Sequence, residues 1–146
     1  MPVLVLTGPA VPHAAAFVRP EALPDALAHP GAVALDLDNT ADVAVLAPHL
    51  PRIALIRIAF PAFADGRGFS LGQRLRQLGY RGRLRAQGPL IPDQRAALVG
   101  SGFDELELTA EVLDRQGGAG AWAARPSQSP FVRRRQRQAV PRASAA

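Results

Sequence analysis

The part of this chain that comes closest to a chemical site is the turn within residues 60–70, where two glycines flank Arg67. An apolar run over 53–60 precedes the turn, and Ser70 opens an amphipathic stretch after it. A strand that leads through such a turn into a helix gathers free backbone N–H groups, a guanidinium and the positive end of the helix dipole. The pattern predicts a site that holds an anion, and it names neither the anion nor a reaction.

Three turns are expected at the same edge of the fold, because ligands of open α/β sheets and half-barrels collect outside the carboxyl ends of the strands. They span 36–40, 65–70 and 87–93. Arg85, two residues before the last turn, would add a second cation to neutralise bound charge. The candidate anion-binding residues are Asp65, Gly66, Arg67, Gly68, Ser70, Arg85, Gly88, Asp93 and Gln94.

The Gly-Arg-Gly turn also has a purely structural interpretation. In that interpretation the glycines only permit a tight turn. Ser70 then acts as a helix cap, and Asp65 pairs locally with Arg67. The residues alone leave both interpretations open.

The stretch 33–40, an apolar run that ends in Asp-x-Asp-x-Thr, suggests a different chemistry. It resembles the first motif of haloacid-dehalogenase-type phosphatases, which would make Asp36 a nucleophile and Asp38 a general acid, with Mg²⁺ between carboxylates. The chain departs from those enzymes because it has no lysine. In addition, Asp104 and Glu105 open a strand where the metal-binding acids should follow one. The phosphatase is therefore the third hypothesis.

The composition excludes several kinds of chemistry. All 17 basic residues are arginine and cysteine is absent. Schiff-base catalysis, a Walker lysine, thiol catalysis, disulfides and thiolate-bound zinc are therefore excluded. The three histidines lie in proline-flanked passages without ligand spacing, and no dinucleotide-binding glycine motif follows a strand. We expect neither a metal nor a cofactor.

The pattern of apolar residues predicts an α/β fold in a single domain. Four predicted strands, at 32–37, 53–60, 83–86 and 104–108, alternate with helix patterns, and 53–60 is typical of a buried parallel strand. We therefore predict a small, mostly parallel sheet of βα units, either open or half-barrel-like. The domain is expected over 1–124 with its motif-rich part at 32–116, and the passage 7–30 gives no clear pattern.

Two helix starts are predicted from capping signals. The Ser-x-x-Gln sequence from Ser70 matches a capping box and predicts that a helix begins there. A helix over 41–47 is predicted to be capped by Asn39 or Thr40 and to end at Pro48, which cannot donate a helical hydrogen bond.

The excess of positive charge that gives the chain its net charge of +5 lies in its last residues. Residues 125–146 hold six arginines and no acid, which leaves 11 Arg against 12 Asp and Glu, a formal −1, in 1–124. The nearly neutral domain gives no case for a nucleic-acid surface, so we do not expect nucleic-acid binding except through the tail. The tail is predicted to be disordered. No apolar run approaches the ~20 residues that span a bilayer, and the first residues make a poor signal peptide, so we expect a cytoplasmic protein.

An ordered series of short motifs between about Ala32 and Leu108 resembles a bacterial family, domain-of-unknown-function family nine-three-four. The motifs that carry the resemblance are Leu37-x-Asn39, Asp42, Leu46, Phe60-Pro61, Asp65-Gly66-Arg67-Gly68-Phe69-Ser70, Leu75-Arg76, Gly79-Tyr80-Arg81-Gly82, Leu84-Arg85-Ala86, Gly88, Asp93-Gln94 and Gly102-Phe103-Asp104. The chain departs from the family pattern at Pro92, where an arginine is usual, and at Gly100-Ser101, where Arg-Cys is frequent.

This resemblance implies a biological process. Members of the family are typically encoded beside assimilatory sulfite reductase, so we expect an accessory protein of sulfite or sulfate reduction that binds an oxyanion or a phosphorylated metabolite. The alternative is an interaction module in which the turns are structural, and an exposed sheet face or the basic tail docks sulfite reductase or another sulfur-assimilation enzyme. Whether the protein is an enzyme is left open.

Overall fold

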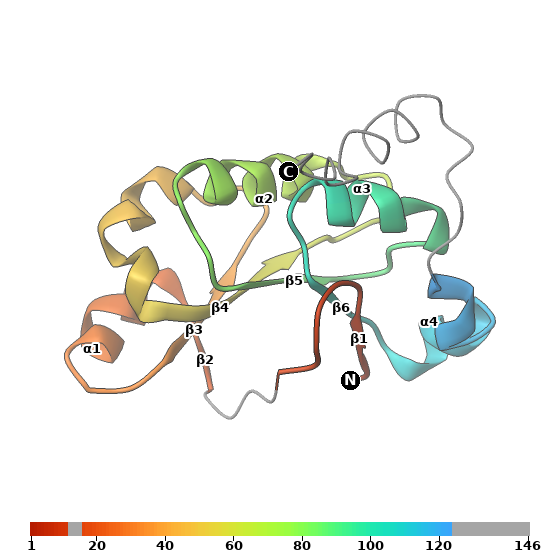
Figure 1. Cartoon of the computed structure of the whole chain (residues 1–146), viewed down its shortest axis with the longest axis horizontal. Coiled ribbons are helices and arrows are strands. Elements are labelled where there is room, and N and C mark those ends of the chain that lie inside the picture. The colour runs from red at the N-terminus through yellow and green to blue at the C-terminus, as the bar shows by residue number, and fades with distance from the viewer. Residues whose placement is uncertain (12–15, 124–146) are drawn as a thin grey trace, which may run out of the picture.

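The computed structural model describes residues 1–11 and 16–123 (Figure 1). The tail that is predicted to be disordered, 125–146, lies outside the described residues. Six strands form one sheet in the order β1-β6-β5-β4-β3-β2. The strands are β1 (Val3–Val5), β2 (Phe17–Val18), β3 (Val33–Leu37), β4 (Ile53–Ala59), β5 (Arg83–Gln87) and β6 (Glu105–Glu107).

The sheet is parallel from β2 to β6, and β1 pairs with β6 in the antiparallel sense at one edge. The predicted mostly parallel α/β sheet is confirmed, with the four strands from β3 to β6 as consecutive neighbours. β4 has the strongest strand signal in the sequence, a β-branched and nearly continuous apolar run, and it is a central strand, as such a pattern predicts.

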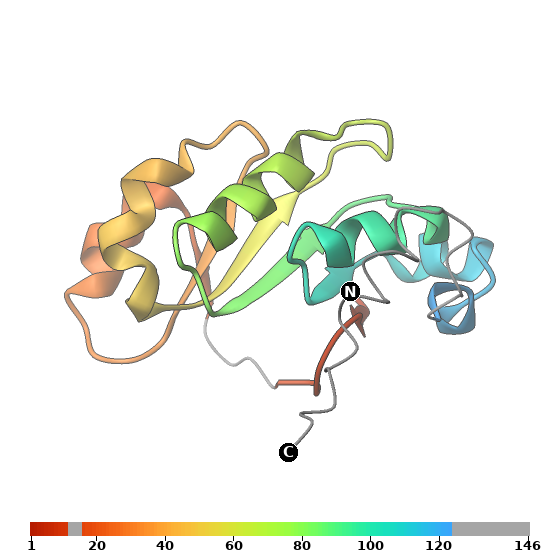
Figure 2. The same cartoon turned by 45° about the horizontal axis from the view of Figure 1, so that its top comes forward.

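The helical segments connect the strands and follow the last one. They are η1 (Pro20–Ala22), α1 (Leu23–Leu27), η2 (Val43–Arg52), α2 (Arg67–Gln77), η3 (Pro92–Gln94), α3 (Arg95–Gly100), α4 (Ala110–Arg115) and η4 (Ala119–Trp122). Each strand from β3 to β6 is placed beside the previous one in the same direction. Because such crossovers are right-handed, the connecting helices come to one face of the sheet, where Figures 1 and 2 show η2, α2 and α3 together.

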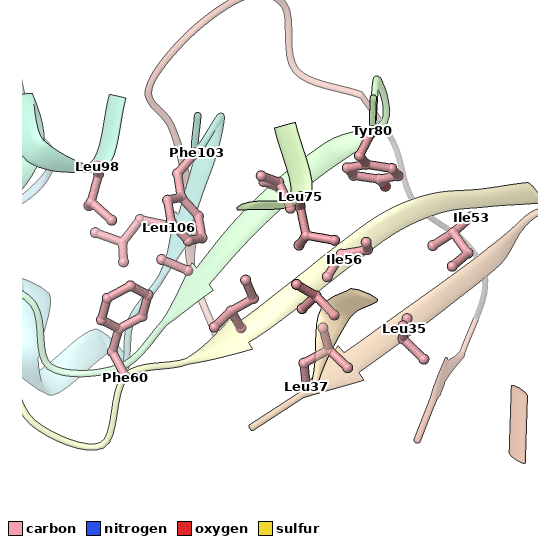
Figure 3. Close-up of a cluster of buried hydrophobic side chains, with 14 of the residues drawn as sticks. Leu35, Leu37, Ile53, Ile56, Phe60, Leu75, Tyr80, Leu98, Phe103 and Leu106 are labelled. Carbon is pink, nitrogen blue, oxygen red and sulfur yellow. The ribbon is translucent and has the colours of Figure 1, made fainter. Parts of the chain in front are cut away.

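The hydrophobic core fills the space between this face of the sheet and the helices (Figure 3). Leu35, Ile56 and Leu106 come from three strands, and Leu75 and Leu98 come from α2 and α3; all five are fully buried. Successive side chains of a strand point to opposite faces. The alternate positions of β3 to β6 therefore face away from this core, and they include most of the charged residues of the sheet.

Both predicted helix starts are wrong in detail. η2 is a 3₁₀ helix that begins at Val43, and its cap is Asp42, whose carboxylate accepts a hydrogen bond from the backbone N–H of Ala44. Prolines 48 and 51 lie inside this segment, and their missing N–H groups prevent a regular α-helical ladder. α2 begins at Arg67, so Ser70 is an exposed residue inside its first turn and not a cap.

Candidate functional site

The carboxyl-end edge of the sheet brings together the three turns that the sequence predicts there. The Asn39 side-chain amide, after β3, donates to Oδ2 of Asp65, after β4, at 2.8 Å. The Gln94 side-chain amide, after β5, donates to the carbonyl of Phe63 at 2.6 Å. The loop that joins β4 to α2 is therefore hydrogen-bonded to both neighbouring turns.

Phe60 fixes the start of this central loop. Its ring is fully buried and makes edge-to-face contacts with Phe69 and Phe103, at 5.1 and 5.6 Å between ring centroids. Gly88 has a φ of 148°, and a Cβ on it would lie 1.9 Å from the Phe60 carbonyl oxygen. A Cβ on Gly68 would lie 2.4 Å from the Phe60 ring. These two glycines are thus required by close packing, and only Gly88 also needs a positive φ.

The amino end of α2 is occupied by a carboxylate of the chain itself. Oδ1 of Asp65 accepts hydrogen bonds from the backbone N–H and Nε of Arg67, at 3.2 and 3.1 Å, and Oδ2 accepts one from its NH2 at 2.8 Å. These hydrogen bonds from Arg67, with that from Asn39, hold the pKa of the Asp65 carboxyl well below its usual range. The place where the sequence predicts an external anion therefore already holds an anionic group.

Two side chains of the central loop region project into solvent at this edge. Phe63 is 55% exposed, and the side chain of Arg67 is 62% exposed although it is paired with Asp65. Large exposed apolar side chains are few in the described chain, and Phe63 is the aromatic one among them. Because the loop is held by Asn39 and Gln94, these two side chains are presented on a fixed backbone.

Arg85 does not join the predicted group, and this expectation is wrong. Its neighbours on β5, Leu84 and Ala86, face the helices, so Arg85 faces the opposite side of the sheet. There it is 8% exposed, donates from NH1 to Glu107 at 3.1 Å, and lies 3.6 Å from Glu105.

The remaining predicted residues lie on the carboxyl-end edge. Gly66 is the residue that precedes α2, with a φ of −84°, so its turn does not require a positive φ. Asp93 is exposed on η3. Ser70 is exposed on α2. Of the predicted set, Asp65, Arg67 and Gln94 make the polar contacts that hold the edge together.

A row of charges on the far face of the sheet was missed by sequence reasoning. Arg57 of β4 makes a two-pronged ion pair with Asp36 of β3, at 3.0 and 2.9 Å, and its NH1 reaches both carboxylate oxygens of Glu107 at 3.2 Å. The Phe17 ring of β2 lies under this guanidinium, 3.8 Å from its carbon to the ring centroid. The signal was present as charged residues at every second position of β5 and β6 and as a single charged residue within each of the apolar strands β3 and β4.

The same contacts bear on the phosphatase motif. Asp36 is bound to Arg57 on the far face of the sheet, whereas Asp38 is exposed beyond the end of β3 and pairs with Arg19 at 2.7 Å. The two carboxylates that would share a Mg²⁺ ion are therefore held by different arginines. Over residues 1–11 and 16–123, no group of three or more histidines and acids is placed to hold a metal.

None of the helices in the described part of the chain has the length and apolar character needed to cross a membrane.

The fold and the site define a class of protein: a small α/β domain with a mostly parallel sheet, η2, α2 and α3 on one face, and three interlocked turns at the carboxyl ends of its strands. The chain belongs to the bacterial family described as "Bacterial protein of unknown function (DUF934)", which matches residues 34–124. The match begins at the second residue of β3 and covers the rest of that strand, β4 to β6 and all three turns. No curated protein and no solved structure matches the chain significantly.

Proposed function

We propose that this protein is an accessory protein of assimilatory sulfite or sulfate reduction and that it docks sulfite reductase or another enzyme of that process. The process comes from the resemblance of its ordered motifs to a family typically encoded beside assimilatory sulfite reductase. The proposed docking role is inferred from the side chains exposed at the carboxyl-end edge of the sheet.

The observation that carries the docking function is the exposure of Phe63 and Arg67 on one braced loop region. Aromatic residues and arginine are enriched in protein interfaces, and they provide a large share of the binding hot spots. A loop that is already ordered loses little conformational entropy when a partner binds. We therefore expect a partner surface with an apolar pocket for the Phe63 ring and a carboxylate close to Arg67.

The experiment is a binding titration of the full chain against purified sulfite reductase from the same organism. Phe63→Ala and Arg67→Ala should each weaken the complex by about tenfold or more, because a truncated hot spot costs ~2 kcal/mol. Val11→Ala is the matched apolar control, since Val11 is 49% exposed and belongs to none of the three turns. Arg74→Gln, at an exposed position of α2, is the control for charge.

A complex that binds equally well with both site variants would contradict this function. So would a complex that the two control variants weaken as much as the site variants do. Melting temperatures of all four variants show whether each one is folded.

A second candidate function is oxyanion binding at the same edge, and one observation favours it. The Arg67–Asp65 pair is open to solvent, with 62% of the Arg67 side chain exposed. Exposed ion pairs contribute only about 0–1 kcal/mol, so an incoming sulfate, sulfite or phosphate can compete with Asp65 for the guanidinium. A rise in melting temperature with these anions above that with sodium chloride, lost in Arg67→Ala, supports this function; no such rise contradicts it.

A further inference from the structure

β1 (Val3–Val5) is the outermost strand on one side of the sheet (Figure 1), and it pairs with β6 in the antiparallel sense. On either side of this strand, the backbone N–H of Leu6 donates to the carbonyl of Asp104 at 2.8 Å, and the N–H of Leu108 donates to the carbonyl of Pro2 at 3.2 Å. In an antiparallel pair only every second residue bonds to the partner strand. The even-numbered residues of β1 and its flanks therefore direct their backbone groups toward β6.

The backbone N–H and C=O groups of Val3 and Val5 consequently point away from β6, along the open side of the strand. No strand of the described chain lies beyond them. The row ends at Thr7, whose N–H turns back to the carbonyl of Asp104 at 3.1 Å. Each copy of the protein thus presents two backbone donors and two backbone acceptors on this strand.

The side chains along this strand are apolar and partly exposed. Val3 and Val5 are each 39% exposed, and Met1 is 63% exposed. Residues 2–18 contain no Asp, Glu, Arg or Lys, although charged side chains are a common means by which proteins keep edge strands from pairing. A twofold contact sets each residue against the same short segment of another copy. Here such a contact brings apolar side chains together and places no like charges opposite each other.

We propose that β1 pairs with β1 of a second copy, in the antiparallel sense and about a twofold axis at Leu4. In this register Val3 of each copy lies opposite Val5 of the other. Two hydrogen bonds join Val3 to Val5 of the second copy, and two more join the symmetry-related pair. All the outward backbone groups of both strands are then used, and the valine side chains form apolar cross-strand pairs. The strand is thus self-complementary, as a twofold interface requires.

The contact is short, so the dimer is weak. Standard interfaces of stable complexes bury about 1,200–2,000 Å², and three residues of strand from each copy bury less than that. We expect a dissociation constant of ~0.1–1 mM, so that the monomer predominates at micromolar concentrations. The dimer is independent of the proposed docking function, because the docking edge is formed by the turns that follow β3, β4 and β5.

The first test is sedimentation equilibrium of the full chain at concentrations from ~20 μM to ~1 mM, a range that brackets the expected dissociation constant. We expect the average mass to rise with concentration from one chain toward two. Val5→Lys should weaken association by about tenfold or more, because it sets a charged side chain against the apolar strand of the second copy. Val45→Lys is the matched control, since it adds the same charge at a 65% exposed position of η2.

Three outcomes of this test would overturn the proposal. They are a mass that stays at one chain over the whole range, association of Val5→Lys as strong as that of the wild type, and equal weakening by Val45→Lys. Circular dichroism spectra show whether each variant is folded.

The second test is disulfide crosslinking, which reports the register because the chain contains no cysteine. Val3→Cys and Val5→Cys are prepared separately, one of them with an affinity tag, then mixed and oxidised. Directly opposite residues of a hydrogen-bonded antiparallel pair have Cα atoms ~5.5 Å apart, which suits a disulfide. We expect the disulfide between positions 3 and 5 to exceed the statistical ratio that random collisions of the two variants give. The statistical ratio, or a preference for disulfides between identical positions, would overturn the proposal.

Discussion

Asp65 accepts three hydrogen bonds from Arg67, two residues later in the chain. A carboxylate of the chain itself therefore occupies the amino end of α2. Asn39 reaches the same carboxylate from the preceding turn. The Gly-Arg-Gly turn therefore resembles an anion site that contains its own anion. This arrangement orders the loop that presents Phe63, and it requires any external anion to displace Asp65.

The first prediction concerns the ionisation of Asp65. Because the hydrogen bonds from Arg67 lower the pKa of this carboxyl, their contribution to stability is present above the unfolded-state pKa of ~3.9. It is lost as the pH falls through the folded value. Carboxyl ¹³C chemical shifts measured against pH should show Asp65 titrating at a higher pH in Arg67→Gln than in the wild type. Equal midpoints in the two proteins would contradict the pairing.

The second prediction concerns Gly68. A Cβ at this position would lie 2.4 Å from the buried ring of Phe60. Gly68→Ala should therefore lower the free energy of unfolding by ~1–3 kcal/mol, the usual cost of overpacking. Gly66→Ala is the matched control, because the nearest atom, on Phe69, is 3.9 Å from its Cβ position. Urea denaturation measures both, and equal effects of the two substitutions would argue against the packing.

The third prediction concerns Tyr80, the single tyrosine of the chain. Burial raises the pKa of its phenol, so the folded state binds this proton more tightly than the unfolded state. The resulting stabilisation is fully present below the unfolded-state pKa of ~10 and is lost as the pH rises from there through the folded-state pKa. Absorbance at 295 nm should show ionisation only together with unfolding. Reversible ionisation near pH ~10 with an unchanged circular dichroism spectrum would refute this.

The fourth prediction concerns the ion pair of Asp36 and Arg57 on the far face of the sheet. The pair is partly buried, so removing one partner leaves the other charge without its counter-ion in a poorly solvated place. In a double-mutant cycle with Asp36→Asn and Arg57→Met, the double variant should be more stable than the sum of the single losses by ~1–2 kcal/mol. Thermal and urea unfolding supply the four free energies. Simple additivity would mean that the two side chains do not interact.

The strands were predictable because 32–37 and 53–60 are apolar runs and 83–86 and 104–108 are strand-like segments between turn residues. Their parallel order followed from the lengths of the connections. Two strands were harder to predict. β2 has only two residues and lies in a proline-rich passage without periodicity. β1 is a short strand, and no local pattern determines that it pairs antiparallel with β6. Helix starts failed where a capping signal competed with packing: Ser70 looks like a cap, yet α2 extends one turn earlier to place Gly68 against Phe60.

The sequence was sufficient to predict which turns form the site. The sequence places Asp65, Arg67 and Gln94 after neighbouring parallel strands, and the structure brings them to one edge. Arg85 was misplaced although the alternation of Arg83, Leu84, Arg85 and Ala86 carried the signal. The two apolar residues face the core, so the two arginines face away from it. Thr7 and Arg83 are in contact although they lie 76 residues apart in the chain, and no local pattern reveals such a contact.

The central claim, that the carboxyl-end edge docks an enzyme of sulfur assimilation, is tested most directly by site-specific photo-crosslinking in cells. The crosslinking amino acid benzoylphenylalanine is placed at position 63 in one strain and at position 11 in another, both exposed in the structure. We predict a crosslink from position 63 to sulfite reductase or another sulfur-assimilation enzyme, identified by mass spectrometry, and none from position 11. The same crosslink from position 11, or none from position 63, would contradict the claim.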